Sequence, residues 1–208
     1  AVLSTVGFDP DVSQKQHIGF NGGFSWRYTS EKYFSTICSI AGEVNFSSIG
    51  WNEDILDIND AHVINSNGSA EKYSRTLNYI QIPVFAHLAW GREEKGFNFF
   101  IQAGPQIGFL LSEKTSKNYD TPNMDANTGR SNTIIAQESM DVENKFDYGI
   151  AAGAGIEYSS RHIGHLLLEA RYYYGLGNIY GSSKRDYFSK SNFSNIVIKA
   201  TWLVDLSK

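Results

Sequence analysis

The chain of 208 residues contains one cysteine, Cys38, and four prolines. A single cysteine excludes an intramolecular disulfide and every zinc site that is built on paired cysteines. No apolar run approaches the roughly 20 residues that a membrane-spanning helix requires. Charged residues make up 19% of the chain, the net charge is −4 and there is no long basic run, so we expect no nucleic-acid partner.

Oxygen-rich loops are present, but they lack the spacing of known cation sites. The candidate ligands are Asp57, Asn59 and Asp60 in one loop, and Asp120 and Asp125 in another. Neither loop has the glycine and the terminal glutamate that an EF-hand needs at fixed positions. We therefore expect solvated loops, no bound metal and no cofactor.

The five histidines do not mark a catalytic site either. His17 and His62 fall on the side of the long loops, whereas His162 and His165 lie near a short turn on the other side. No spacing picks out a nucleophile, a base and an orienting acid. Two histidines alone make a weak metal site. The sequence thus predicts a non-enzymatic protein, with a hydrolase site at the loop rim as a minor alternative.

The dominant positive feature is an alternation of apolar residues with small or polar ones. A period of two indicates β-strands that have one face in each of two environments. The expected strands span residues 2–8, 17–28, 33–47, 73–90, 97–111, 145–158, 165–177 and 193–206. We expect a single domain over residues 1–208, with a signal segment upstream of Ala1 and a first strand that is either complete or truncated at its N-terminal end.

The connections alternate between short and long. Short turns are expected at 29–32, 91–96 and 159–164, and long loops at 9–16, 48–72, 112–144 and 180–192. This pattern is typical of bacterial outer-membrane barrels. The predicted fold is all-β: an eight-stranded antiparallel up-and-down transmembrane β-barrel with short periplasmic turns and long extracellular loops.

The alternation also assigns two sets of side chains to the two faces of the barrel. Buried charges must be paired, so we expect an interior network that fills the narrow lumen. Its members would be Arg27, Glu43, His87, Asp147, Glu157, Glu169, Arg171 and Lys199. Aromatic rings would form a girdle at headgroup depth beside the short turns. Its members would be Trp26, Tyr28, Phe34, Trp90, Phe97, Tyr158 and Trp202.

Four consecutive segments resemble the PorT-like outer-membrane β-barrel family of the Bacteroidetes. They are NYIQIPVFAHLAWG, FFIQAGPQIGFLLS, FDYGIAAGAGIEY and LLLEARYYYGLGNI. The resemblance covers about 73–202 and implies an eight-stranded barrel in the outer membrane of a Gram-negative bacterium. It implies structural roles for Glu169, Arg171, Tyr172, Gly175 and Leu176. It does not imply a reaction, although the family's namesake is associated with type IX protein secretion.

Four functions remain open at this stage. The first is a scaffold or accessory subunit of an envelope complex, in protein secretion or in outer-membrane assembly or transport, which binds another envelope protein through its loops or its lipid-facing wall. The second is a small porin-like channel, and the third is the rim-sited hydrolase. The fourth is a soluble ligand-binding barrel of lipocalin type, or a barrel that binds a surface ligand. The long strands and aromatic strand ends favour the membrane, so outer-membrane lipid is an expected partner.

Overall fold

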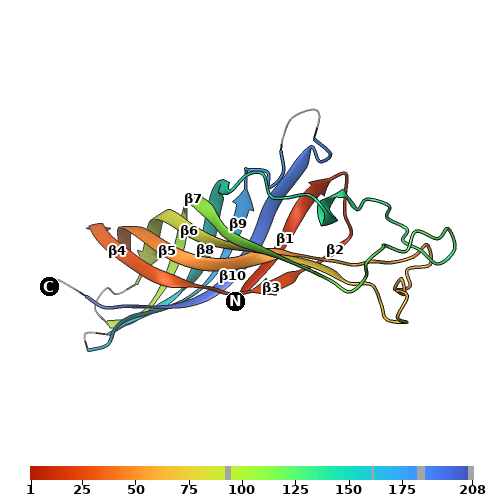
Figure 1. The fold of residues 1–208 in the computed structure, drawn as a ribbon. Helices are drawn as coiled ribbons and strands as arrows, with labels where there is room; N and C mark the ends of the chain where they lie inside the picture. Colours follow the sequence, from red (N-terminus) through yellow and green to blue (C-terminus); the bar gives the residue numbers. More distant parts are fainter. Residues whose placement is uncertain (92–94, 161, 182–185, 206–208) are drawn as a thin grey trace.

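The structure is a computed structural model that describes residues 1–91, 95–160, 162–181 and 186–205. Within these residues it contains ten strands and one short 3₁₀ helix (Figure 1). The elements are β1 Val2–Asp9, β2 Gln14–Lys15, β3 His17–Gly19, β4 Asn21–Tyr33, β5 Thr36–Glu53, β6 Tyr73–Trp90, β7 Lys95–Lys117, η1 Ala136–Glu138, β8 Phe146–Ser160, β9 Gly164–Gly175 and β10 Lys190–Leu203. Among the described residues, no helix has both the length and the hydrophobicity to span a membrane.

All strands pair with antiparallel neighbours in one curved sheet. The order is β2–β5–β6–β7–β8–β9–β10–β1–β3, and β4 also pairs with β5. β1 pairs with β10 over its whole length, from Val2 opposite Val197 to Asp9 opposite Lys190. The first and last long strands of the chain are therefore neighbours, as the rolled sheet in Figure 1 shows.

The expected count of eight strands is wrong, because the expected strand 17–28 is divided between β3 and β4, and a further strand, β2, lies in the expected loop 9–16. In the segment 14–33, β2 and β4 pair with β5, whereas β3 pairs with β1 over only three residues. No one strand of this segment pairs with both β1 and β5, so the hydrogen-bonded ladder between these two strands is not continuous. An added Cβ on Gly19 of β3 would stand 1.8 Å from the Ser48 carbonyl oxygen, so β3 lies close to β5 as well.

The short turn expected at 29–32 also lies elsewhere. β4 continues to Tyr33, and the chain reverses at Phe34 and Ser35 before β5 begins. Phe34 has a positive φ of 55°, which a tight reversal requires and which non-glycine residues rarely adopt. Parts of the other two expected turns, at 92–94 and 161, and the expected end of the last strand at 206 lie outside the described residues.

The two faces of the wall differ sharply in exposure along β9 and β10. Leu168 and Ile198 are 52% and 51% exposed, whereas the adjacent Glu169 and Lys199 are 4% and 9% exposed. The outward face is therefore apolar and the inward face charged. A fold of this kind is suited to an apolar solvent rather than to water.

The loops at the other end from the short turns are folded rather than merely solvated, which corrects our expectation. β5, β6 and β7 extend together beyond the rest of the wall, and the segments 54–72, 118–145, 176–181 and 186–189 lie at this loop end (Figure 1). Their buried side chains form one cluster with the strand ends. The cluster includes Val12, Trp51, Ile55, Val63, Tyr73, Tyr119, Val142, Ile179, Tyr180 and Phe188. We call this packed assembly the cap.

Candidate functional site: an ion-paired interior beneath a folded cap

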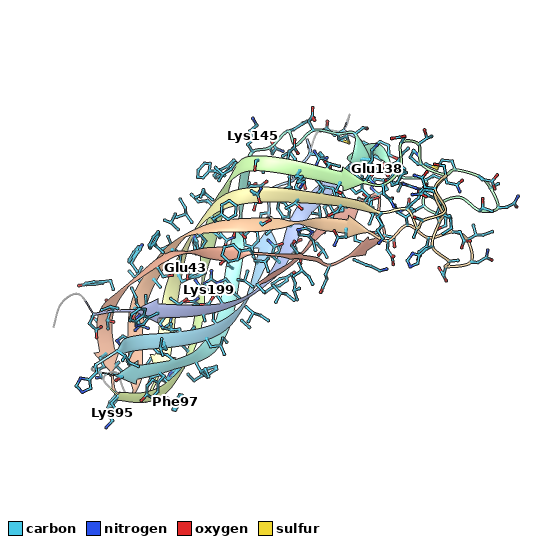
Figure 2. The ribbon with its side chains drawn as sticks, turned by 60° about the horizontal axis from the view of Figure 1, so that its bottom comes forward. Glu43, Lys95, Phe97, Glu138, Lys145 and Lys199 are labelled. Carbon is cyan, nitrogen blue, oxygen red and sulfur yellow. The ribbon has the colours of Figure 1, made fainter. Side chains whose placement is uncertain are left out.

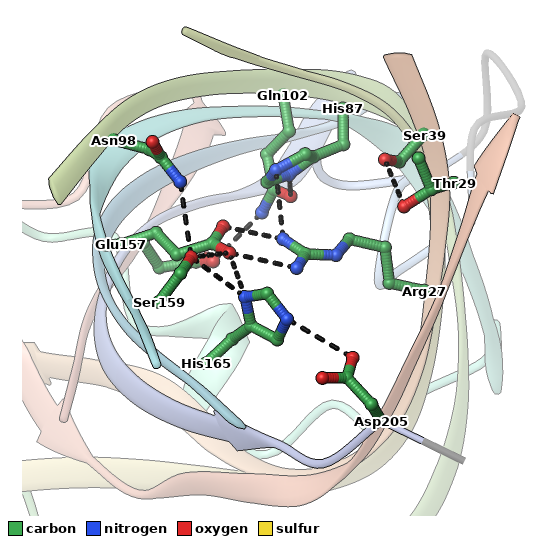
Figure 3. A network of polar contacts seen from close by, with 11 residues as sticks. Arg27, Thr29, Ser39, His87, Asn98, Gln102, Glu157, Ser159, His165 and Asp205 are labelled. Carbon is green, nitrogen blue, oxygen red and sulfur yellow. Dashed lines mark hydrogen bonds and ion pairs between the residues drawn. The ribbon is translucent and has the colours of Figure 1, made fainter. Parts of the chain in front are cut away.

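The half of the interior nearest the short turns contains a dense polar network (Figure 3). Arg27 of β4 forms a bidentate ion pair with Glu157 of β8: Nη1 donates to Oε2 at 2.6 Å and Nη2 donates to Oε1 at 2.9 Å. Glu157 Oε1, which accepts from Arg27 Nη2, also lies 2.6 Å from His165 Nδ1. His165 Nε2 in turn lies 3.2 Å from Asp205, near the end of the described chain. Planar guanidinium groups suit such bidentate pairing.

A short relay of hydrogen bonds links this cluster to the middle of the interior. Arg27 Nη1 contacts His87 Nε2 at 3.5 Å, His87 Nδ1 contacts Gln102 Oε1 at 3.1 Å, and Gln102 Nε2 donates to Glu169 at 2.9 Å. Arginine can only donate, and the amide nitrogen of Gln102 is engaged with Glu169. The neutral tautomer of His87 that carries its proton on Nδ1 satisfies every contact.

The middle of the interior is occupied by a second ion-pair cluster. Arg171 donates to both oxygens of Glu43 at 2.9 Å and lies 2.5 Å from Glu169. Lys199 donates to Glu43 at 2.5 Å, and Asn45 donates to it at 2.7 Å. Figure 2 shows Glu43 and Lys199 side by side within the wall, midway between its two ends.

The charges of the connected network balance. Its three buried or nearly buried cations face three carboxylates. The cations are Arg27, Arg171 and Lys199, and the carboxylates are Glu43, Glu157 and Glu169. The remaining expected member, Asp147, lies apart from them and accepts a hydrogen bond of 2.6 Å from the Tyr173 hydroxyl. All eight expected interior residues thus face inward, and seven of them join one network.

One corner of the network resembles a catalytic triad in composition. Ser159 Oγ lies 3.0 Å from His165 Nδ1, and Asp205 contacts the other ring nitrogen. However, Ser159 has no exposed surface, and Glu157 shares the same histidine nitrogen. A serine nucleophile must reach its substrate, so this geometry builds structure rather than an active site.

The expected girdle is distributed more widely than the sequence suggested. Phe97 packs against Tyr158 in a tilted arrangement with ring centroids 5.1 Å apart, and Trp90 stacks on Phe99 at 6.1 Å. Trp202 donates its indole N–H to the Ile163 carbonyl at 2.6 Å. These rings lie at the turn end, where Figure 2 labels Phe97. Phe34 lies in the first reversal.

Trp26 and Tyr28 do not lie beside a turn, because β4 runs further than expected. Trp26 pairs with Gly42, which pairs with Val84 in the middle of β6. An added Cβ on Gly42 would stand 2.4 Å from the indole, so the ring lies flat over the wall. Both side chains are more than half exposed.

The cap is organised around Gln137, a fully buried residue of η1. Its backbone carbonyl accepts hydrogen bonds from Arg75, Tyr73 and Tyr180. Arg75 also donates to the Met140 carbonyl and to Glu113, each at 2.6 Å. The strand extension β6–β7 and two loops are therefore joined at one point.

A second part of the cap surrounds Glu53 and Arg130. Glu53 Oε1 accepts hydrogen bonds from Gln137 and Trp51, and burial raises the pKa of its carboxyl group from 4.5 to about 7. Arg130 pairs with Glu71 and Glu138 and covers the Tyr119 ring at 4.6 Å. Glu53 and Arg130 lie beyond the apolar part of the wall.

The oxygen-rich loops use their carboxylates to hold turns. Asp57 accepts hydrogen bonds from the amides of Ala61 and Asn59, which lower the pKa of its carboxyl group. Asp125 is held in the same way by the amides of Asn127 and Thr128. Across the described ranges, no group of three acidic, histidine or cysteine side chains is placed to bind a metal.

The candidate histidines do not come together. His17 lies between Asn52 and Thr76, at 3.3 and 3.4 Å, whereas His62 is exposed in a loop bridge opposite Leu56. His162 is exposed at the turn end, and His165 belongs to the interior network. Sequence reasoning overlooked Arg75, Arg130 and Gln137. One signal could have indicated the cap: Arg75, Tyr73 and Trp51 lie on strand positions beyond the apolar part of the wall.

Comparison with known protein families supports the interpretation of the geometry. The family model described as "Outer membrane protein beta-barrel domain" matches residues 3–181. Neither the curated proteins nor the solved structures gave a match. The family match covers most of the chain and agrees with the apolar outer face and charged interior. The chain therefore belongs to the outer membrane protein beta-barrel domain family and is located in the bacterial outer membrane.

Proposed function

We propose that this protein is a non-enzymatic scaffold or accessory subunit of an envelope complex, and that it acts through its cap rather than through a pore. The observation that carries the proposal is the balanced ion-pair network across the interior. A lumen filled by paired charges braces the wall, whereas a conducting lumen needs water and accessible charge. We also propose that the wall forms a closed barrel, in which the segment 14–33 lies between β1 and β5, and that the cap faces outward.

The cap presents a defined surface to a partner. Ile58 and Ile64 are 69% and 49% exposed, and Met124 in the neighbouring loop is 44% exposed. Asn123 contacts the Ile64 carbonyl, which brings the two loops together. Exposed apolar side chains on an ordered framework are suited to binding another protein.

The PorT-like assignment and a role in secretion or assembly belong to the same proposal. They rest on the four sequence segments in their tandem order. The second candidate is a narrow conducting path, which the continuous hydrogen-bond chain from Asp205 to Lys199 would favour.

Photocrosslinking in intact cells tests the scaffold proposal. A photoreactive amino acid at Ile58 should give one discrete adduct with an envelope protein. The matched control is the same amino acid at Ile150, which is 57% exposed on the outward wall. An adduct from Ile150 alone would place the partner on the wall and contradict the cap as the binding surface. Absence of a protein adduct from both sites would contradict the scaffold function.

A further inference from the structure

A groove of about 370 Å³ crosses the outward face of β8, β9 and β10 near the turn end. Its edge toward the turns is a row of side chains that the ladder aligns across four strands: Phe97, Tyr158, Leu166 and Trp202. Its other side is formed by the next row, where Leu168 lies opposite Ala200. Because Ala200 carries only a methyl group between the larger Ile198 and Trp202 on the same face, it leaves the space that the groove occupies.

The aromatic edge of the groove is held in place by contacts within the wall. Trp202 donates its indole N–H to the Ile163 carbonyl at 2.6 Å, and Phe97 packs against Tyr158 with ring centroids 5.1 Å apart. Trp202 and Phe97 are nevertheless 66% and 73% exposed, so the described residues leave most of both side chains uncovered. The groove is therefore preformed and open to the medium around the wall.

A cation lies beside the aromatic edge, on the side of the turns. Lys95 precedes Phe97 by two residues on β7, so both side chains belong to the outward face. Figure 2 labels both at the turn end. Lys95 is exposed and has no hydrogen-bond or ion-pair partner among the described residues. Its row continues across the ladder with Ser160 and Gly164, which carry no charge.

These features restrict the chemistry of the occupant. The groove opens on a face that contacts lipid, because the chain is located in the outer membrane. An apolar groove on this face accepts a hydrocarbon chain, and tryptophan and tyrosine rings lie at headgroup depth. A lysine just beyond these rings attracts a phosphate group, and a second positive charge within the headgroup would oppose that attraction. The combination fits an anionic phospholipid better than a zwitterionic one.

We propose that the groove and Lys95 bind one phospholipid with an anionic headgroup, its acyl chain in the groove and its phosphate on the Lys95 ammonium. The proposal differs from general lipid contact, because it specifies one saturable site with a charge preference. It is independent of the scaffold function, because it requires no protein partner.

Native mass spectrometry of the full chain in detergent micelles tests the site, with phosphatidylglycerol and phosphatidylcholine of identical acyl chains as probes. One phosphatidylglycerol molecule should bind at a concentration about tenfold lower than phosphatidylcholine requires, the effect expected for one charge-assisted contact. Equal binding of the two lipids overturns the anionic assignment. Failure of both to bind, or a bound number that rises without saturating at one, overturns the site.

Matched variants assign the bound lipid to the groove. Lys95→Gln should remove the preference for phosphatidylglycerol, and Ala200→Leu should fill the groove and weaken binding of both lipids about tenfold. The controls are Lys114→Gln on the exposed loop-end part of β7 and Ala152→Leu at an exposed position of β8 outside the groove. Unchanged binding in both site variants, or equal losses in the controls, overturns the proposal.

Photocrosslinking in intact cells identifies the occupant of the groove. A photoreactive amino acid at Leu166, which lines the groove and is 45% exposed, should give a phospholipid adduct. An adduct with another protein, or with a second copy of this chain, would show that a protein covers the groove and would overturn the lipid assignment.

Discussion

Arg171 on β9 and Glu43 on β5 meet across the interior, with each terminal guanidinium nitrogen 2.9 Å from a different carboxylate oxygen. The strands that carry them are separated in the sheet by β6, β7 and β8. The pair therefore ties together parts of the wall that share no backbone hydrogen bond. Arg171 also covers the Phe85 ring at 4.4 Å, which fills the space beside the pair.

Glu43→Ala should destabilise the protein strongly. It removes the carboxylate that Arg171, Lys199 and Asn45 share and leaves buried cations without compensation. Loss of one partner from a buried pair costs about 3–5 kcal/mol. Urea unfolding in lipid vesicles measures the change. The control is Glu31→Ala, at an exposed position of β4; equal free-energy losses in the two variants would contradict the bracing role.

Leu168→Arg should impair insertion into the membrane. Leu168 is 52% exposed on the apolar outer face, where an arginine costs about 2–4 kcal/mol near the bilayer midplane. The fraction folded in lipid vesicles, followed by protease protection, reports the effect. Ser116→Arg on the exposed extension of β7 should insert normally. If Leu168→Arg inserted as well as Ser116→Arg, the outer face would not contact lipid.

Arg75→Met should loosen the cap without unfolding the wall. The substitution removes the donor that joins Gln137, Met140 and Glu113. The Met140 carbonyl then loses its Arg75 partner at about 1–3 kcal/mol, whereas the Gln137 carbonyl keeps two tyrosine donors. Hydrogen exchange should rise at 134–142 and remain unchanged in β8 and β9. The control is Lys114→Met on the neighbouring strand. Uniform exchange throughout the chain would show that the cap and wall unfold as one unit.

The cap should also lose stability as the pH rises. Burial raises the pKa of Glu53 from 4.5 to about 7, so the folded state binds more protons than the unfolded chain between these values. The contribution of Glu53 is therefore complete below pH 4.5 and is lost as the pH rises to about 7. Limited proteolysis of the cap at a series of pH values, relative to Glu53→Gln, measures it. An identical pH profile in Glu53→Gln would contradict the assignment.

The strands of the wall were largely predictable, because the alternation of apolar and polar residues that marks each strand lies within the strand itself. Alternation gave β6 its bounds at Tyr73 and Trp90 without error. The same period assigned Glu169 and Arg171 to the inward face, because neighbouring side chains of a strand must point to opposite sides. The division of 14–33 was not predictable, because alternation does not say which neighbour a strand pairs with, and here β3 pairs with β1 whereas β2 and β4 pair with β5.

The cap was not predictable for a related reason. Its main contacts join residues distant in the sequence, such as Arg75 with Gln137 and Arg130 with Glu71. No periodicity marks a loop residue that becomes buried only when other loops pack on it. The loops therefore looked like solvated connections, although Trp51 and Tyr180 have no exposed surface.

Planar-bilayer recording of the purified protein tests the central claim most directly, namely that the ion-paired interior is filled and that function lies in the cap. The protein inserted into a planar membrane should give a current indistinguishable from the bare membrane, while a water-filled porin recorded under the same conditions gives discrete steps. Reproducible steps from this protein that Glu43→Ala or Arg27→Ala alters in size would show that the network lines a conducting path and would contradict the account.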